Sequence, residues 1–162
     1  STGGTSFQTL GQEGLELINK YESSQLTAVQ SMPTGTFSYR GIATYGTENI
    51  GNAGVSEEPI LVSSINLDAN FSNNSLMGSL SNFVDFENYT ASGVIPLNGT
   101  ISGNGFVATG SGVLVEPIDN DQFSTSADIN GQFYGNQAEA ATGFISVTMD
   151  GVAGSGVFIA ER

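Results

Sequence analysis

The sequence predicts an all-β fold, an eight-stranded antiparallel up-and-down β-barrel that follows a short N-terminal helix or irregular lead-in. Its 162 residues suit one domain with a substantial core, and 22 of them are glycine, which is costly inside helices and useful in bends. From Pro33 onward apolar residues recur with a period of two, which is typical of strands. Turn sequences separate these runs, most clearly Asp150-Gly151, which favours a type I′ hairpin.

We expect residues 1–32 to form the lead-in and residues 33–162 to form the single barrel domain. A short helix is plausible only within residues 9–30, where a partial apolar stripe consists of Leu15, Ile18 and Leu26. This segment is expected to close one end of the barrel.

The strands are expected in order along the rest of the chain. In the first strand, large and small apolar residues alternate with polar residues, and in the second Ile65, Leu67, Ala69 and Phe71 share a face. Ser72-Asn73-Asn74 and Gly103-Asn104-Gly105 are turn sequences that join successive strands. The eight expected strands cover residues 36–45, 61–71, 75–83, 91–101, 106–115, 128–134, 141–149 and 152–160.

Closure into a barrel removes exposed strand edges, and eight strands leave an interior that side chains can fill. Glycines within the strands permit tight coiling and close approach of the backbone. The side chains expected to fill the interior are Phe37, Tyr39, Phe71, Phe106, Phe133, Phe144 and Phe158.

The charge balance excludes two classes of partner. Three Lys and Arg residues against sixteen Asp and Glu residues give a net charge of −13, so phosphate neutralisation on nucleic acid and attraction to anionic lipid are both disfavoured. No apolar run approaches the roughly 20 residues of a membrane helix, and the polar faces and missing Trp girdles disfavour a membrane barrel. Membrane attachment is therefore expected only through a lipid anchor that is not present in this chain, and the protein is expected to be monomeric.

The absence of His and Cys removes Ser-His-Asp triads, Cys-His pairs and ordinary zinc sites. A hydrolase with two carboxylates remains open, although the acidic residues are scattered over loops. Asp119-Asn120-Asp121 lacks the spacing of a specific calcium loop. We therefore expect no enzyme activity, no cofactor and no metal.

Several stretches resemble the β-barrel domain of the transferrin-binding protein B family. Residues 131–144, GQFYGNQAEAATGF, resemble that domain's Phe-Tyr-Gly signature, residues 34–45 resemble its first strand, and residues 154–162 resemble its last strand. The signature residues are Gly131, Phe133, Tyr134, Gly135, Ala138, Glu139, Gly143 and Phe144. Glu139 stands one position earlier than the usual acid.

The resemblance implies an exported protein of a Gram-negative bacterium, displayed on the outer membrane or secreted. It also implies a non-catalytic binding protein, which engages a host or nutrient-carrier protein and has an outer-membrane assembly or receptor protein as a further partner. The alternative is a carrier of haem or another small hydrophobic ligand, with a cavity as in lipocalins.

Loops on a rigid scaffold commonly carry binding, so the long acidic connections are the candidate partner-binding segments. They are residues 46–58, 84–90 and 116–123, and their candidate residues are Glu57, Glu58, Asp85, Glu87, Asp119 and Asp121.

Overall fold

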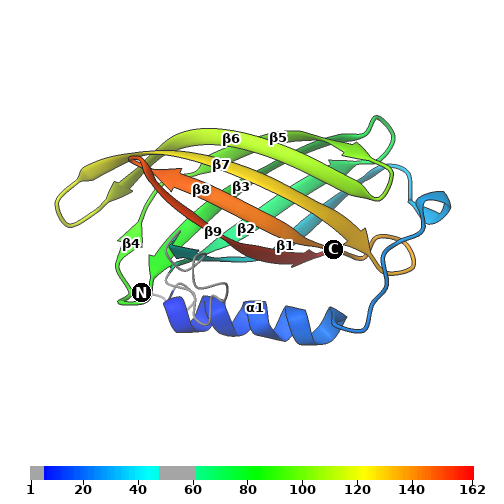
Figure 1. The fold of residues 1–162 in the computed structure, drawn as a ribbon, viewed down its shortest axis with the longest axis horizontal. Coiled ribbons are helices and arrows are strands. Elements are labelled where there is room, and N and C mark those ends of the chain that lie inside the picture. Colours follow the sequence, from blue (N-terminus) through cyan, green and yellow to red (C-terminus); the bar gives the residue numbers. More distant parts are fainter. Residues whose placement is uncertain (1–5, 48–60) are drawn as a thin grey trace.

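Eight long antiparallel strands close into a barrel, which confirms the predicted fold class (Figure 1). The computed structural model describes residues 6–47 and 61–162. The strands are β1 (Thr36–Thr47), β2 (Leu61–Asn70), β3 (Ser75–Asp85), β4 (Thr90–Ala91), β5 (Ile95–Ser102), β6 (Gly105–Glu116), β7 (Asp121–Tyr134), β8 (Ala140–Met149) and β9 (Val152–Glu161). They follow the order β2-β1-β9-β8-β7-β6-β5-β3-β4, and an additional pairing of β2 with β3 closes the circle.

Two of the predicted strands, 91–101 and 128–134, differ from the structure by more than two residues at one end. The expected strand 91–101 is divided into the two-residue strand β4 and the strand β5. Gly93 lies between them with φ +126°, a conformation that favours glycine, and a Cβ atom there would approach the Val113 carbonyl oxygen to 2.7 Å. The expected strand 128–134 begins seven residues earlier, at Asp121 of β7, so the expected loop 116–123 is shorter than predicted.

The barrel interior holds a cluster of aromatic rings. Phe133 is fully buried, and its ring centroid lies 4.9 Å from Phe106, 5.0 Å from Phe71 and 5.5 Å from Tyr39. Aliphatic side chains of every long strand surround these rings, and β9 adds Phe158 besides Ala160. Tilted and edge-on contacts at these separations add to the stabilisation from burial.

Phe144 does not fill the interior, so that prediction was wrong. Its side chain is 67% exposed, because Ile145 and Val147 occupy the inward positions of β8. Val157, its cross-strand partner on β9, is also on the outer face. Side chains of a strand alternate between its two faces, so one residue's placement fixes the others.

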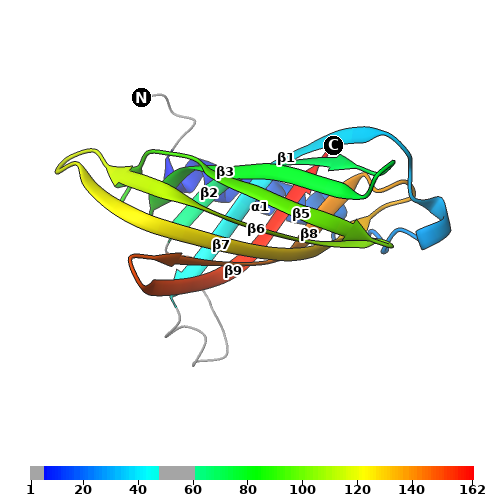
Figure 2. The same cartoon turned by 90° about the horizontal axis from the view of Figure 1, so that it is seen from above.

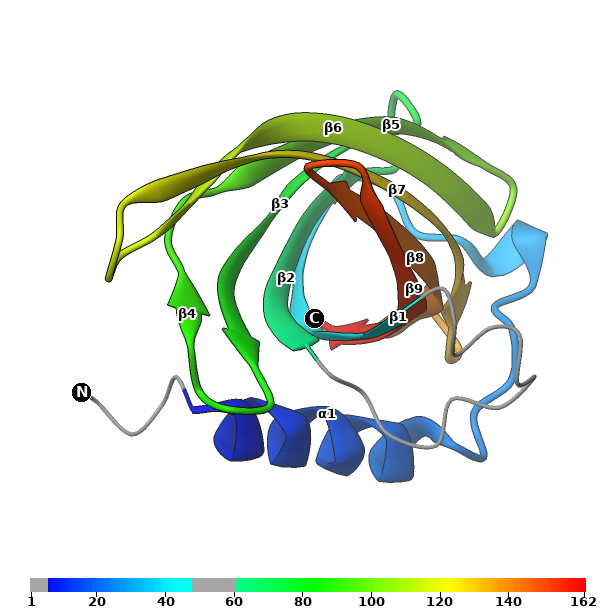
Figure 3. The same ribbon diagram turned by 60° about the vertical axis from the view of Figure 1, so that its left-hand side comes forward.

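Helix α1 (Phe7–Tyr21) lies along the outside of the barrel wall rather than across an end, as Figures 1 and 3 show. The Ser6 side chain caps it by accepting a hydrogen bond from the Thr9 backbone N–H at 3.0 Å. Leu10 and Gly14 are its buried residues, and a Cβ atom on Gly14 would lie 3.2 Å from a methyl group of Ile42 on β1. The glycine thus allows a close approach of the helix to the wall.

The apolar stripe of Leu15, Ile18 and Leu26 expected in the helical segment is mostly exposed, so the helix does not use it to pack against the barrel. Leu15 and Ile18 are about half exposed on one side of α1, and Leu26 lies after the helix has ended. The segment after α1 does reach a barrel end: the Thr27 N–H donates to the Phe133 carbonyl at 2.9 Å, and the Thr27 hydroxyl donates to the Gly135 carbonyl at 2.7 Å.

The two ends of the barrel carry different segments. Figure 2 shows the β6–β7 connection projecting at one end and the segment between α1 and β1 at the other, which also includes the short 3₁₀ helix Val29–Ser31. We call the first of these the loop end; it holds the connections 85–90 and 116–121. We call the second the signature end; it holds residues 131–139 of the family signature. Within the described residues, none of the helices has the length and apolar character needed to span a membrane.

Candidate functional site

The described acidic candidates lie at the loop end. Asp85 ends β3 and Glu87 lies in the β3–β4 connection, while Asp119 lies in the β6–β7 connection and Asp121 begins β7. Both connections project from the same end because β3 and β6 run in the same direction in the antiparallel barrel (Figure 1). Glu57 and Glu58 lie outside the described residues.

The β3–β4 connection is ordered by its own first acid. The Asp85 carboxylate accepts hydrogen bonds from the backbone N–H groups of Glu87 at 2.8 Å and Tyr89 at 2.9 Å. Asn88 adopts φ +67°, and its side-chain oxygen accepts a hydrogen bond from the Phe7 N–H at the start of α1 at 2.9 Å. Asp85 therefore shapes this loop, while Glu87 remains exposed to solvent.

The β6–β7 connection is ordered in a similar way. Glu116 uses both carboxylate oxygens, accepting from the N–H of Ile118 at 2.6 Å and of Asp119 at 2.9 Å. Asn120 adopts φ +59° to complete the turn. One oxygen each of Glu116, Asp119 and Asp121 lie within 4.8 Å of one another, which is the group that could hold a cation. The hydrogen bonds to Glu116 give this acid a structural role that the sequence did not reveal.

The two connections are tied together at their base. Ser92, just after β4, and Val115 on β6 exchange two backbone hydrogen bonds of 2.8 Å. A paired backbone on both sides limits how far the loops can move relative to each other. These hydrogen bonds therefore hold the bases of the two loops together at the loop end.

Exposed apolar side chains accompany the acids at this end. Phe86 is 60% exposed, Tyr89 is 54% exposed and Ile118 is 70% exposed. Sequence reasoning missed these residues because it selected the loops by charge, although large apolar residues inside the polar segments 84–90 and 116–120 were a readable signal. Aromatic and aliphatic side chains of this kind are the usual anchors of protein interfaces.

The signature end is built for folding. A Glu139 carboxylate oxygen accepts from the Gln137 N–H at 2.9 Å, and its backbone carbonyl accepts from the Arg162 N–H at 2.9 Å. Ala138 is fully buried with φ +61°, and its carbonyl accepts from the buried Tyr39 hydroxyl at 2.5 Å. Burial raises the pKa of Tyr39, which keeps this hydroxyl a donor.

The signature glycines are required by close packing. Gly131 and Gly143 face each other across β7 and β8, and a Cβ atom on Gly143 would lie 2.4 Å from the Gly131 Cα. Gly135 adopts φ +102°, and a Cβ there would meet the Glu139 carboxylate. Tyr134 is half-buried at the rim and pairs with Leu26 of the lead-in. These contacts form a corner of the barrel.

An ion pair connects α1 with the last strand. The Lys20 ammonium lies 2.8 Å from a Glu161 carboxylate oxygen, which also accepts from the Tyr21 hydroxyl at 2.7 Å. The hydrogen bond from Lys20 lowers the pKa of Glu161.

A group whose pKa is lower in the folded state stabilises the fold above its unfolded pKa, and this stabilisation is lost as pH falls through the folded value. We therefore expect acid to weaken the docking of the C-terminal part of α1 before the barrel unfolds. A carboxyl NMR titration should place Glu161 below an ordinary glutamate, and Glu161→Gln should remove the acid dependence of the Lys20 and Tyr21 amide shifts. An unshifted titration would contradict this assignment.

A family model for the C-lobe and N-lobe β-barrels of transferrin-binding protein B matches residues 32–162. The chain belongs to this family of barrel domains. A mutant of the vaccine antigen transferrin-binding protein B from Haemophilus parasuis Hp5 is 27% identical, with a TM-score of 0.53 over 85% of this chain. Intact Ap-TbpB, with its N and C lobes, shares the fold at 23% identity and a TM-score of 0.55, also over 85% of this chain.

This chain spans 28% of the length of each of these two solved transferrin-binding protein B chains. Comparison with curated protein sequences gave no match. The resemblance expected from residues 34–45, 131–144 and 154–162 is confirmed, and the family match begins one residue before the expected barrel boundary. The division into a lead-in and a single domain stays a prediction.

Proposed function

We propose that this chain is a non-catalytic binding domain whose loop end engages a carrier protein of the host, with transferrin as the first candidate. The observation that carries the proposal is the loop end itself. There Phe86, Tyr89 and Ile118 project into solvent beside the exposed carboxylates of Glu87 and Asp119. Family membership supports a binding role, since the named relatives are transferrin-binding proteins.

The charge of the chain favours a partner with a basic surface. A net charge of −13 speeds association with a cationic face and disfavours acidic partners. The apolar side chains would supply most of the affinity, because exposed carboxylates at an interface rim contribute mainly to the association rate. Mutations of the apolar side chains and mutations of the carboxylates should therefore have different effects on affinity and association rate.

We further propose a location on the outer-membrane surface or in secreted form in a Gram-negative bacterium. The Haemophilus parasuis relative is a vaccine antigen, which fits a protein that antibodies can reach. An outer-membrane receptor or assembly protein is a second expected partner, and attachment to the membrane would use a lipid anchor. The carrier alternative receives less support, because the interior is occupied by the Phe133 cluster.

Loss of the exposed apolar side chains is expected to weaken transferrin binding. The variant Phe86→Ser/Ile118→Ser should lower the affinity by a factor of about 10 or more, as at the anchor residues of other interfaces. The charge variant Glu87→Lys/Asp119→Lys should mainly slow association, and the effect should shrink at high salt. Biolayer interferometry with immobilised transferrin measures both rate constants.

Phe144→Ser is the matched control, because Phe144 is 67% exposed on the outer wall and away from the loop end. Its affinity should equal that of the unaltered chain. Equal losses of affinity in the loop variants and in this control would show that the loop end has no special role. Unchanged affinity in the loop variants would contradict the proposed binding surface.

A further inference from the structure

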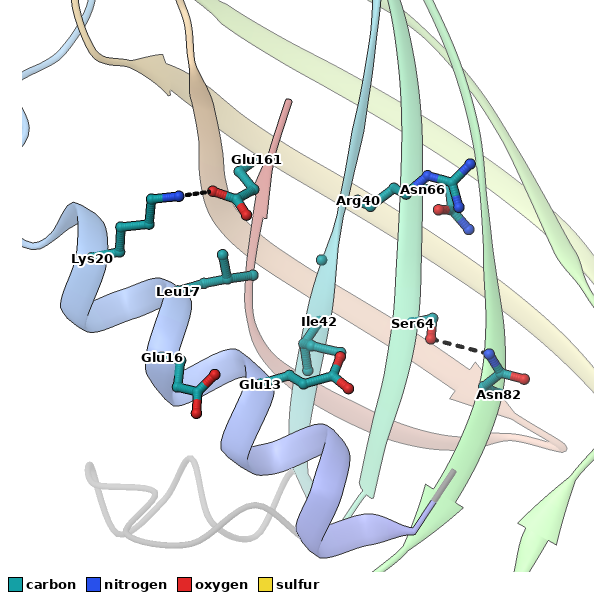
Figure 4. Close-up of a pocket in the computed structure, with 11 residues that line it drawn as sticks. Glu13, Glu16, Leu17, Lys20, Arg40, Ile42, Ser64, Asn66, Asn82 and Glu161 are labelled. Atoms are coloured by element: carbon teal, nitrogen blue, oxygen red, sulfur yellow. Dashed lines mark hydrogen bonds and ion pairs between the residues drawn. The ribbon is translucent and has the colours of Figure 1, made fainter. Parts of the chain in front are cut away.

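A polar groove between α1 and the barrel wall is separate from the loop end and from the barrel interior. It has a volume of about 580 Å³, and its two banks come from different elements (Figure 4). Glu13 and Glu16 line it from α1, while Arg40 lines it from β1. Asn66 and Ser64 on β2 and Asn82 on β3 complete the strand side.

The charges in the groove are arranged asymmetrically. The Lys20–Glu161 ion pair lines one part and neutralises itself. Among residues 6–47 and 61–162, no ion pair or hydrogen bond engages the side chains of Arg40, Glu13 or Glu16. Arg40 is one of only three basic residues in the chain. One bank thus offers an exposed cation and the other offers exposed carboxylates, none of them in an ion pair among the described residues.

Asn82 is held in an unusual conformation beside this groove. It adopts φ +55° within β3, next to the register shift between β2 and β3 at Val62 and Ser64. Its side-chain amide donates to the Ser64 hydroxyl at 3.1 Å, and both residues line the groove. A bulge re-aims side chains, and a non-glycine residue at positive φ inside a strand costs free energy that glycine would not. The chain keeps an amide where a glycine would be less strained.

We propose that this groove binds a short zwitterionic peptide of two or three residues. The peptide carboxylate would pair with Arg40, since a guanidinium offers two parallel donors to a carboxylate. The peptide ammonium would lie toward Glu13 and Glu16 on the opposite bank. Asn66 and Asn82 carry amide groups that match the donors and acceptors of the peptide backbone. The volume lies within the range of small-ligand sites.

Triglycine is the probe, because it carries the two charges and the backbone without side chains. Titration followed by the backbone amide shifts of Arg40, Asn66 and Asn82 should show saturable binding. Triglycine amide, which lacks the carboxylate, and N-acetyl-triglycine, which lacks the ammonium, should each bind at least about 10-fold more weakly, as expected for loss of a charge-assisted hydrogen bond.

Two variants assign the charges by comparison with these capped probes. In Arg40→Gln the difference in affinity between triglycine and triglycine amide should disappear. In Glu13→Gln/Glu16→Gln the difference in affinity between triglycine and N-acetyl-triglycine should disappear. Both substitutions are on exposed side chains, so the fold should be retained. No saturable binding of triglycine, or equal binding of all three probes, would overturn the proposal.

Asn82→Gly tests whether the strained residue serves the ligand. It should keep or raise thermal stability while it weakens triglycine binding at least about fivefold, because it removes an amide and relieves the positive φ. Asn74→Gly is the matched control: Asn74 has φ +62° in the β2–β3 turn and does not line the groove. Unchanged binding in Asn82→Gly, or equal loss in Asn74→Gly, would show that the amide has only a structural role.

Discussion

Replacement of Phe133 by alanine is expected to lower the free energy of unfolding by about 3–5 kcal/mol, the usual cost of removing a buried aromatic ring. Phe133 is fully buried, and its ring contacts Phe71, Phe106 and Tyr39 at the centre of the aromatic cluster. The three neighbouring rings belong to different parts of the barrel and cannot all move into the vacated space. Urea unfolding followed by circular dichroism measures the change.

Phe144→Ala is the control for this prediction, because it removes the same side chain from the outer face of the same barrel corner. Phe144 is 67% exposed, so the change should stay within about 0.5 kcal/mol. Similar losses in the two variants would mean that the interior cluster does not hold the barrel together.

Replacement of Gly143 by alanine is expected to destabilise the protein by about 3 kcal/mol or more, although it adds only one methyl group. A Cβ atom there would lie 2.1 Å from the Asn130 carbonyl oxygen and 2.4 Å from the Gly131 Cα. Both are backbone atoms of the paired strand β7, so relief requires the strands to separate rather than a side chain to rotate. Thermal unfolding followed by calorimetry should show a large fall in Tm, or no cooperative transition.

Gly11→Ala should have the opposite sign. A Cβ atom on Gly11 meets no other atom within 4 Å, and alanine is favoured over glycine in a helix by about 1 kcal/mol. A gain in Gly11→Ala with a loss in Gly143→Ala would separate helix propensity from steric fit. Tolerance of alanine at Gly143 would contradict the close strand packing in this corner.

The fold was predictable because period-two apolar runs and turn sequences reach through most of the chain. Tyr39, Ile65 and Phe133 all face inward as alternation predicts. The prediction for Phe144 was wrong because it followed residue size, whereas the alternation along β8 places Phe144 on the outer face. A count along the strand from Ile145 and Val147 would have placed it correctly.

The candidate site was less predictable, since charge alone does not show what a carboxylate bonds. The carboxylate oxygens of Asp85 and Glu116 accept hydrogen bonds from backbone N–H groups of their own turns. These hydrogen bonds depend on the conformation of the turn, which the charge of the residue does not indicate. The docking of α1 along the wall was also hidden, because its contact relies on Leu10 and Gly14 rather than on Leu15 and Ile18. A glycine in a helical segment does not indicate from the sequence alone which surface the helix packs against.

The family signature and the proposed binding surface thus lie at opposite ends of the barrel. The signature end is fixed by Phe133, Gly143 and Glu139, whose contacts are internal. The loop end presents Phe86 and Ile118 outward on two connections joined at their base. Sequence changes at the loop end can therefore change which partner protein is bound without disturbing the aromatic cluster.

The most direct test of this assignment is a hydrogen-exchange footprint of the chain with and without transferrin. Binding at the loop end predicts slower exchange in residues 84–92 and 113–121, and unchanged exchange in residues 131–144. Protection of the signature end, or of neither end when transferrin is saturating, would contradict the proposed binding surface.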